Sequence, residues 1–208
     1  MRFFSAHHEF EYSWEEVTTN NWRKYCPWND KAEHVIAVDT LSRNLDKTTG
    51  IVSVTSKLLH MKISATNAPQ LRTERLITCK QSAPQWLRSF LGSNDTSYVY
   101  EVSYVDPTSK AVTMCSQNLT WSELISVQET CRYTPATTSQ RTNFEQTAKI
   151  IALCGGWQKI KNKIEEATVE RFGQNAAKGR EGFERVLAIS REVFAEQRRQ
   201  QQGGKVAA

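Results

Sequence analysis

The chain has 208 residues, of which 39% are hydrophobic and 24% charged, and its formal net charge is +5. This length allows one domain with a sizeable core or two small ones, and the composition is that of an ordinary globular protein. No apolar run reaches the roughly 18 residues of a membrane-spanning helix, and the 5 cysteines, which form no CxxC pair, argue against a disulfide framework and against zinc.

The N-terminal stretch alternates between apolar and polar residues and predicts a half-buried strand over residues 2–12. It lacks both the apolar core of a signal peptide and the basic, acid-poor character of a transit peptide. Ser13 and Glu16 have the spacing of a capping box, so we expect a helix from Trp14 to about Tyr25.

Further along, period-two patterns separated by turn residues predict six more strands. Strands joined mostly by short turns favour an antiparallel sheet. The predicted strands cover residues 31–43, 71–80, 96–106, 111–119, 122–133 and 144–154.

Beyond Gly155 the pattern becomes helical and stays so to about Gln202. We expect Gly173 and Gly179 to bend or interrupt this helix. The helix must lie across the concave face of a curved seven-stranded sheet, which gives one α+β domain. A curved sheet that holds a long helix often encloses a cavity.

The C-terminal segment 156–208 holds 11 Lys and Arg against 7 Asp and Glu. A basic segment suits an anionic partner such as a membrane surface or nucleic acid, but on charge alone a solvated helix face is the better explanation. The polar side of this helix is poor in aromatic residues, which argues against nucleic acid.

The strand over residues 71–80 is followed by a short apolar segment that a helix would suit. Pro84 excludes continuation of a central strand, and Gly92 ends the segment. The helix covers either the core, as a plain cap, or a cavity, as a movable lid, and the cavity expected above favours the lid. The lid residues are Pro84, Trp86, Leu87, Phe90 and Leu91.

Signatures of catalysis are missing from the sequence. None of the 4 histidines lies in a GxSxG-like or HExxH motif, and there is neither a GxGxxG motif nor a phosphate-binding loop. An enzyme would need a catalytic pair facing the cavity, and His34 with Asp39 is the one plausible pair. The residues favour a binding protein for a mostly apolar ligand with an anionic group, without metal, cofactor or enzymatic activity.

Several segments resemble, in their order and spacing, the PRELI/Slowmo family of intramitochondrial phospholipid-transfer proteins, in particular its Slowmo branch with the yeast Ups proteins. The resemblance covers residues 1–195, leaving 196–208 as a frayed polar tail. The matching segments are 21–25, 34–39 with Ser42-Arg43, 73–78, Pro84 with Trp86, 101–107, 118–120, and Arg171-Phe172 with Asn175, Ala176, Lys178-Gly179 and Gly182-Phe183.

The resemblance implies an apolar lipid tunnel between the sheet and the long helix, closed by a lid near Pro84. It also implies transfer of an anionic phospholipid between the outer and inner mitochondrial membranes, with transient contact with both. The resemblance further implies that the protein acts in the mitochondrial intermembrane space. There it would form a one-to-one complex with a small twin-cysteine helical hairpin protein of the TRIAP or Mdm type.

A headgroup site follows from the resemblance, because a phosphate in a low-dielectric cavity needs charged donors. Relatives that carry phosphatidic acid tend to have lysines where this chain has Cys79 and Ser82. Fewer cations suit a headgroup with its own ammonium, so we expect phosphatidylserine; the alternatives are phosphatidic acid and an interaction protein without a lipid. The expected headgroup residues are Lys24, His34, Lys80, Arg171 and Lys178.

The 19 residues 52–70 interrupt the resemblance, because in the family the preceding turn leads almost directly into the next strand. One interpretation is a lengthened hairpin, which costs little loop entropy. Our hypothesis is a translated intron. Its length preserves the reading frame, and these amino acids can be encoded by codons that contain splice signals. In either case we expect a mobile surface loop without a role in lipid binding.

Overall fold

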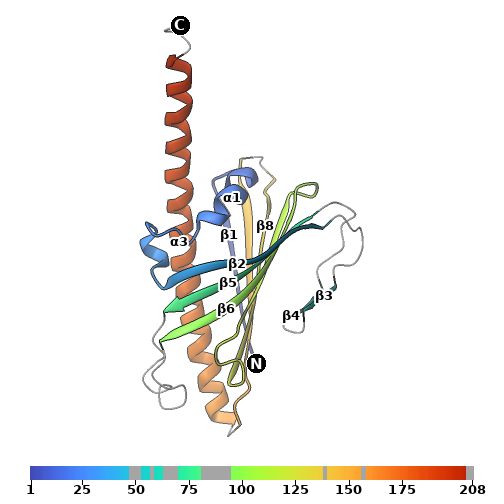
Figure 1. The fold of residues 1–208 in the computed structure, drawn as a ribbon. Helices are drawn as coiled ribbons and strands as arrows, with labels where there is room; N and C mark the ends of the chain where they lie inside the picture. Colours follow the sequence, from blue (N-terminus) through green and yellow to red (C-terminus); the bar gives the residue numbers. More distant parts are fainter. Residues whose placement is uncertain are drawn as a thin grey trace.

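The computed structural model shows a curved, seven-stranded antiparallel sheet held against one long helix (Figure 1), as the sequence predicted. It describes residues 1–46, 53–56, 59–62, 70–80, 95–137, 140–155 and 158–204. The strand order is β1-β9-β8-β7-β6-β5-β2. The strands are β1 (Arg2–Phe10), β2 (Val35–Asp46), β5 (Gln70–Lys80), β6 (Thr96–Asp106), β7 (Ala111–Asn118), β8 (Ile125–Pro135) and β9 (Thr142–Ala152).

Between β1 and β2 the chain forms the helix α1 (Trp14–Asn20) and two 3-10 turns, η1 (Asn21–Arg23) and η2 (Asp30–Ala32). The expected helix to Tyr25 is therefore too long, because two asparagines, which favour caps over helix interiors, end the α-helical part. The second strand begins at Val35 instead of residue 31, because η2 occupies that position.

The C-terminal helix α3 (Gln158–Gly204) is one uninterrupted helix of 47 residues, so Gly173 and Gly179 do not interrupt it. It continues into the segment predicted as a tail, as far as Gly204, because Glu, Gln and Arg are good helix formers. In Figure 1 its C-terminal part projects beyond the sheet.

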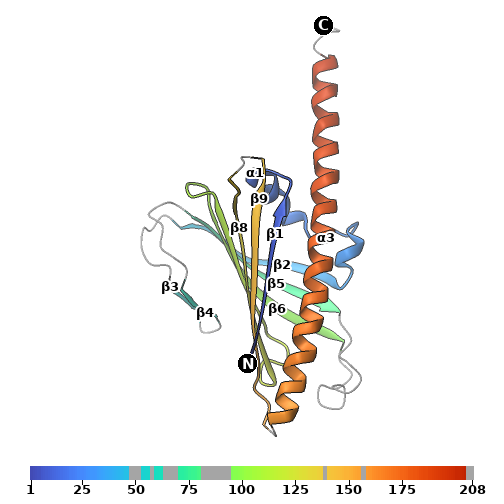
Figure 2. The same cartoon turned by 180° about the vertical axis from the view of Figure 1, so that it is seen from behind.

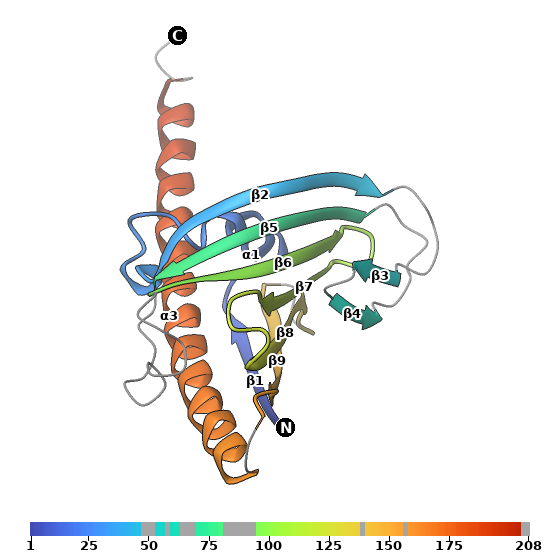
Figure 3. The same ribbon diagram turned by 60° about the horizontal axis from the view of Figure 1, so that its bottom comes forward.

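The core joins α1, α3 and the inner face of the sheet. Phe10 of β1 lies at its centre, with ring centroids 5.8 Å from Phe144, 5.5 Å from Phe183 and 6.3 Å from Tyr133. Viewed from behind (Figure 2), α3 runs past β1, and from below (Figure 3) the sheet bends around it. The buried residues of this core cluster are Phe10, Trp14, Val17, Val112, Met114, Cys131, Tyr133, Phe144, Phe183, Val186 and Leu187.

The segment 52–70 leaves and rejoins the sheet at the far ends of β2 and β5, where Asp46 pairs with Gln70. Two short strands within it, β3 (Ser53–Ser56) and β4 (Leu59–Lys62), pair with each other and form a separate two-stranded sheet. We expected a mobile surface loop here, and that expectation, the origin of the segment and its lack of a role in lipid binding stay predictions.

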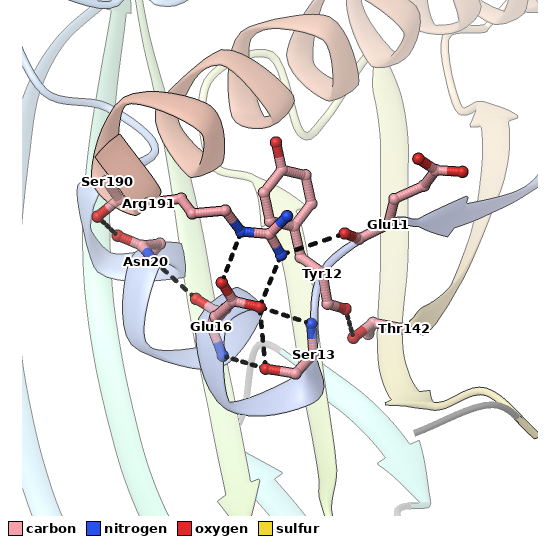
Figure 4. Close-up of polar contacts among 8 residues, drawn as sticks. All are labelled: Glu11, Tyr12, Ser13, Glu16, Asn20, Thr142, Ser190 and Arg191. Atoms are coloured by element: carbon pink, nitrogen blue, oxygen red, sulfur yellow. Dashed lines mark hydrogen bonds and ion pairs between the residues drawn. The ribbon is translucent and has the colours of Figure 1, made fainter. Parts of the chain in front are cut away.

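Polar contacts attach α1 to α3 (Figure 4). The capping box is formed as predicted, with Glu16 accepting from the backbone N–H of Ser13 at 2.9 Å. Arg191 of α3 donates to both carboxylate oxygens of Glu16 at 2.9 Å, and its guanidinium carbon lies 4.1 Å from the centroid of the Tyr12 ring. These donors, Arg191 first, lower the pKa of Glu16 below its ordinary value.

Replacing Glu16 with glutamine should lower the free energy of unfolding by ~0.5–1 kcal/mol at pH 7, because this ion pair is partly exposed. The folded-state pKa of Glu16 is lowered, so its contribution is present above the pKa of an unfolded glutamate and is lost as the pH falls through the folded value. Denaturant unfolding at neutral and acidic pH should therefore show the difference shrinking on acidification. The exposed Glu123→Gln control should show no such trend.

Candidate functional site

A cavity of about 350 Å³ lies between α3 and the inner face of the sheet. Its wall combines apolar side chains with a few cations. Phe172 and Phe183 of α3 form one side, whereas Val99, Val127 and Ile125 contribute from the strands. No helix in the described part of the chain is long and apolar enough to cross a membrane.

Three of the five predicted headgroup residues line this cavity: Lys24, His34 and Arg171. Lys24 follows η1, His34 precedes β2, and Arg171 projects from α3. Three segments distant in sequence therefore bring their basic side chains to one chamber. Arg171 has no ion-pair partner among the described residues, so its guanidinium is available to a ligand.

Close packing between α3 and the η1–η2 loop holds Lys24 in place. A Cβ atom on Gly182 of α3 would come within 2.7 Å of Lys31 Cβ and 2.8 Å of Asn29 Oδ1, so only glycine allows this approach. The side-chain amide of Asn29 donates to the carbonyl oxygen of Lys24 at 2.7 Å. Lys31 also pairs with Glu181 of α3 at 2.7 Å. The packing thereby fixes the loop that carries Lys24 and His34.

Lys24 is half-buried and keeps its charge. Burial by itself would lower the pKa of Lys24, but the acidic groups around it, Tyr25 first, outweigh burial and raise that pKa. Its ammonium nitrogen lies 5.4 Å from the centroid of the Tyr25 ring. The site therefore holds a protonated amine, as an anionic ligand requires.

His34 contributes differently from the other cations. Burial, followed by the positive charges of Lys24 and Lys178, lowers the pKa of His34. The imidazole is therefore neutral at pH 7 and offers a hydrogen bond instead of a charge. The positive charge on the cavity wall comes from Lys24, Arg171 and Arg180, together with Lys31, which pairs with Glu181.

The structure does not place Lys80 and Lys178 on the cavity wall. Both side chains are exposed. Side chains alternate along β5, so Cys79 faces the cavity and Lys80 faces outward. The charge of Lys178 nevertheless contributes to the lowered pKa of His34.

Cys79 occupies a position where we expected related proteins to carry lysine. It is buried and lines the cavity. Burial raises the pKa of the Cys79 thiol to about 11, so the side chain is uncharged at pH 7. The wall of this cavity thus has a neutral group at that position.

The predicted lid residues Pro84, Trp86, Leu87, Phe90 and Leu91, together with Ser82, lie outside the described residues. Among the described residues, Cys79 of β5 and Ser97 of β6 line the cavity. The lid stays a prediction.

Sequence reasoning missed a group of polar side chains on the cavity wall. Glu129 of β8 accepts hydrogen bonds from Gln146 Nε2 at 2.6 Å and from Ser116 Oγ at 3.0 Å. Arg180 of α3 donates to Gln146 Oε1 at 3.3 Å. A signal was present in the sequence, because Glu129 is the charged residue on a strand face otherwise formed by apolar residues.

The pair proposed for an enzymatic alternative is not brought together. His34 lines the cavity, whereas Asp39 is exposed on β2 and is not part of the wall. His34 and Asp39 are five residues apart, and an extended chain of that length spans roughly 16 Å. A general acid–base pair needs hydrogen-bond reach, so this geometry does not suit catalysis by these two residues.

Comparison with known sequences identifies a family and several relatives. The PRELI-like family matches residues 54–193. The chain is 41% identical over 191 residues to the protein UPS2, mitochondrial, of Saccharomyces cerevisiae, covering 91% of this chain and 74% of that protein. It is 38% identical to a UPS-like protein of Schizosaccharomyces pombe, covering 93% of this chain and 94% of that protein. A slowmo homologue of Dictyostelium discoideum is 29% identical, covering 92% of this chain and 74% of that protein.

Two solved structures show more distant similarity. The norcoclaurine synthase of Thalictrum flavum superposes with a TM-score of 0.48 at 9% identity, covering 90% of this chain and 86% of the other. The Zhui aromatase/cyclase of Streptomyces sp. R1128 gives a TM-score of 0.47 at 10% identity, covering 90% of this chain and 93% of the other.

Proposed function

Because this chain belongs to the PRELI-like family, we propose that it transfers a phospholipid between membranes by enclosing the acyl chains in its cavity. One observation carries the proposal: the cavity between α3 and the sheet combines apolar walls with the cations Lys24 and Arg171. Apolar walls suit acyl chains, and protonated donors suit a phosphate.

We propose a carrier instead of an enzyme. The Cys79 thiol on the cavity wall is kept protonated by burial, which raises its pKa to about 11, and a thiol is a much weaker nucleophile than a thiolate. His34 has no acidic partner at Asp39 to activate it. Both observations support binding and release without covalent chemistry.

The proposed ligand is phosphatidylserine, with phosphatidic acid as the alternative. Phosphatidic acid carries more negative charge on its phosphate and needs more cations around it. In this cavity Cys79 is neutral, and Lys80 points outward. A headgroup that brings its own ammonium needs fewer protein cations.

The proposed location is the mitochondrial intermembrane space, where the protein would contact the outer and inner membranes transiently. The relative from Saccharomyces cerevisiae is described as mitochondrial by its name. We also propose a one-to-one complex with a small twin-cysteine helical hairpin protein. Fractionation of cells and of their mitochondria tests the location, and finding the protein in another compartment would contradict it. Mass measurement of the purified protein tests the complex, and a protein without a partner would contradict that proposal.

Lipid that co-purifies with the protein gives the direct test of function. Mass spectrometry of an organic extract should find phospholipid at about one molecule per protein. Transfer between donor and acceptor vesicles should then favour phosphatidylserine over phosphatidic acid. Protein without any lipid would support an interaction protein, and a strong preference for phosphatidic acid would overturn the proposed headgroup.

Replacing Lys24 with methionine should reduce phospholipid transfer by roughly 10- to 100-fold, because a charge-assisted hydrogen bond to phosphate contributes about 1.5–3 kcal/mol. Methionine keeps the volume and removes the charge. The measurement is transfer between vesicles, with circular dichroism to verify the fold. The control Lys149→Met removes an exposed lysine from β9 and should leave transfer unchanged. Equal effects of both substitutions would contradict the assignment of Lys24.

A further inference from the structure

A row of polar side chains crosses the inner face of the sheet. Arg75 of β5 pairs with Glu101 of β6, Glu101 with Ser116 of β7, and Ser116 with Glu129 of β8. Residues directly opposite each other on neighbouring strands point to the same side of a sheet. Since Ser116 and Glu129 line the cavity, the whole row lies on the cavity side.

The two carboxylates of this row differ in their partners. Glu101 forms a buried ion pair with Arg75, whose terminal nitrogen lies 2.5 Å from Glu101 Oε1. Glu129 receives only uncharged donors: Gln146 at 2.6 Å, Ser116 at 3.0 Å and the Cys131 thiol at 3.3 Å. No ion pair of Glu129 is present among the described residues. Its carboxylate therefore faces the cavity without a cation at ion-pair distance, and Lys24 of the same chamber lies near enough for the charge of Glu129 to help raise the pKa of Lys24.

The neighbours of Glu129 hold it in a fixed orientation. Gln146 Oε1 accepts from Arg180 at 3.3 Å, so the amide nitrogen of Gln146 must point towards Glu129, as its 2.6 Å contact shows. Ser116 fixes the second carboxylate oxygen. A carboxylate has about four lone-pair sites, and three donors leave one for a ligand. Glu129 is thus a prepared acceptor on the cavity wall.

Such a carboxylate would repel a ligand that is purely anionic, yet it lies in the chamber of Lys24 and Arg171. A ligand that carries both charges satisfies both sets of groups. We propose that Glu129 binds the ammonium group of the headgroup while Lys24 and Arg171 bind its phosphate. This assignment rests on the proposed lipid-transfer function and makes Glu129 the residue that selects an amine-bearing phospholipid.

Vesicle transfer of three lipids by the Glu129→Gln variant tests the assignment. Phosphatidylserine carries an ammonium, whereas phosphatidylglycerol has the same net charge without one, and phosphatidic acid also lacks one. Loss of a charge-assisted hydrogen bond should reduce phosphatidylserine transfer by roughly tenfold. Transfer of the other two lipids should be unchanged or increased, because the repelling charge is gone.

A matched control and a measurement on the unaltered protein complete the experiment. Glu145→Gln makes the same change on the outer face of β9 and should alter no lipid's transfer. N-acetylated phosphatidylserine has no ammonium. Because the same charge-assisted hydrogen bond is lost, the unaltered protein should transfer it roughly tenfold more slowly than phosphatidylserine. That comparison gives an answer even where Glu129→Gln fails to fold.

The outcomes separate the two proposals. Equal loss for all three lipids would show that Glu129 has a structural role, and no loss would place the ammonium elsewhere; either result overturns the assignment. Equal transfer of phosphatidylserine and its N-acetylated form would overturn it as well. If the unaltered protein transfers none of the three lipids, the proposed function itself fails.

Discussion

Replacement of Arg75 with methionine should lower the free energy of unfolding by about 3–5 kcal/mol, because it leaves a buried carboxylate without its cation. Arg75 and Glu101 are only 3% and 4% exposed, and they contact each other through two hydrogen bonds of 2.8 and 2.5 Å. The guanidinium also lies 5.1 Å from the centroid of the Trp22 ring, and this contact would be lost as well. Urea unfolding at pH 7 measures the change.

A second variant separates the ion pair from the packing. Replacing Arg75 with methionine and Glu101 with leucine together should restore most of the lost stability, because no buried charge then lacks a partner. The control Arg72→Met, on the opposite face of β5, changes a half-exposed arginine and should have a smaller effect. If Arg75→Met lowers the free energy of unfolding no more than this control does, the prediction is wrong and Glu101 must have another partner in the variant.

Truncation of Phe183 to alanine should destabilise the protein by about 3–5 kcal/mol, the usual range for a large aromatic side chain in a core. Phe183 is 1% exposed and contacts the rings of Phe10 and Tyr133, with centroid distances of 5.5 and 6.3 Å. It attaches α3 to β1 and β8, whereas Phe172 attaches the helix to Phe4 of β1 at a centroid distance of 5.1 Å. Chemical denaturation with tryptophan fluorescence measures the effect.

The same helix provides the control for Phe183. Phe194 lies further towards the C-terminus of α3 and is 41% exposed, so Phe194→Ala should change the unfolding free energy little. Similar losses for both variants would mean that the projecting part of α3 is covered in solution.

The fold was largely predictable because local patterns carried the information. Alternation identified the seven strands of the main sheet, and Ser13 with Glu16 identified the start of α1. The helical pattern of apolar residues in α3 extends to Val193 and Phe194, yet the structure leaves both side chains exposed. Burial at the ends of a long helix depends on the length of its partner, which no local pattern encodes.

The candidate site was predictable only in part, for the same reason. Three of the residues that the family resemblance suggested, Lys24, His34 and Arg171, line one chamber, and their role in headgroup binding stays a prediction. The contribution of Glu129 depends on the registers of β7, β8 and β9, which bring Ser116 and Gln146 to it. Cross-strand register is set by long-range pairing, so the sequence showed an unusual charge on an apolar face but not its partners.

The position of β1 in the sheet constrains when this protein can finish folding. Arg2 of the first strand pairs with Ile150 of the last, so β1 has no partner in the sheet until about 150 of the 208 residues have been synthesised. At cellular rates of synthesis this delay is on the order of ten seconds. Pairings of such long sequence separation also form slowly, over roughly milliseconds to seconds. The seven-stranded sheet can therefore close only at a late stage of folding, after β9 has been made.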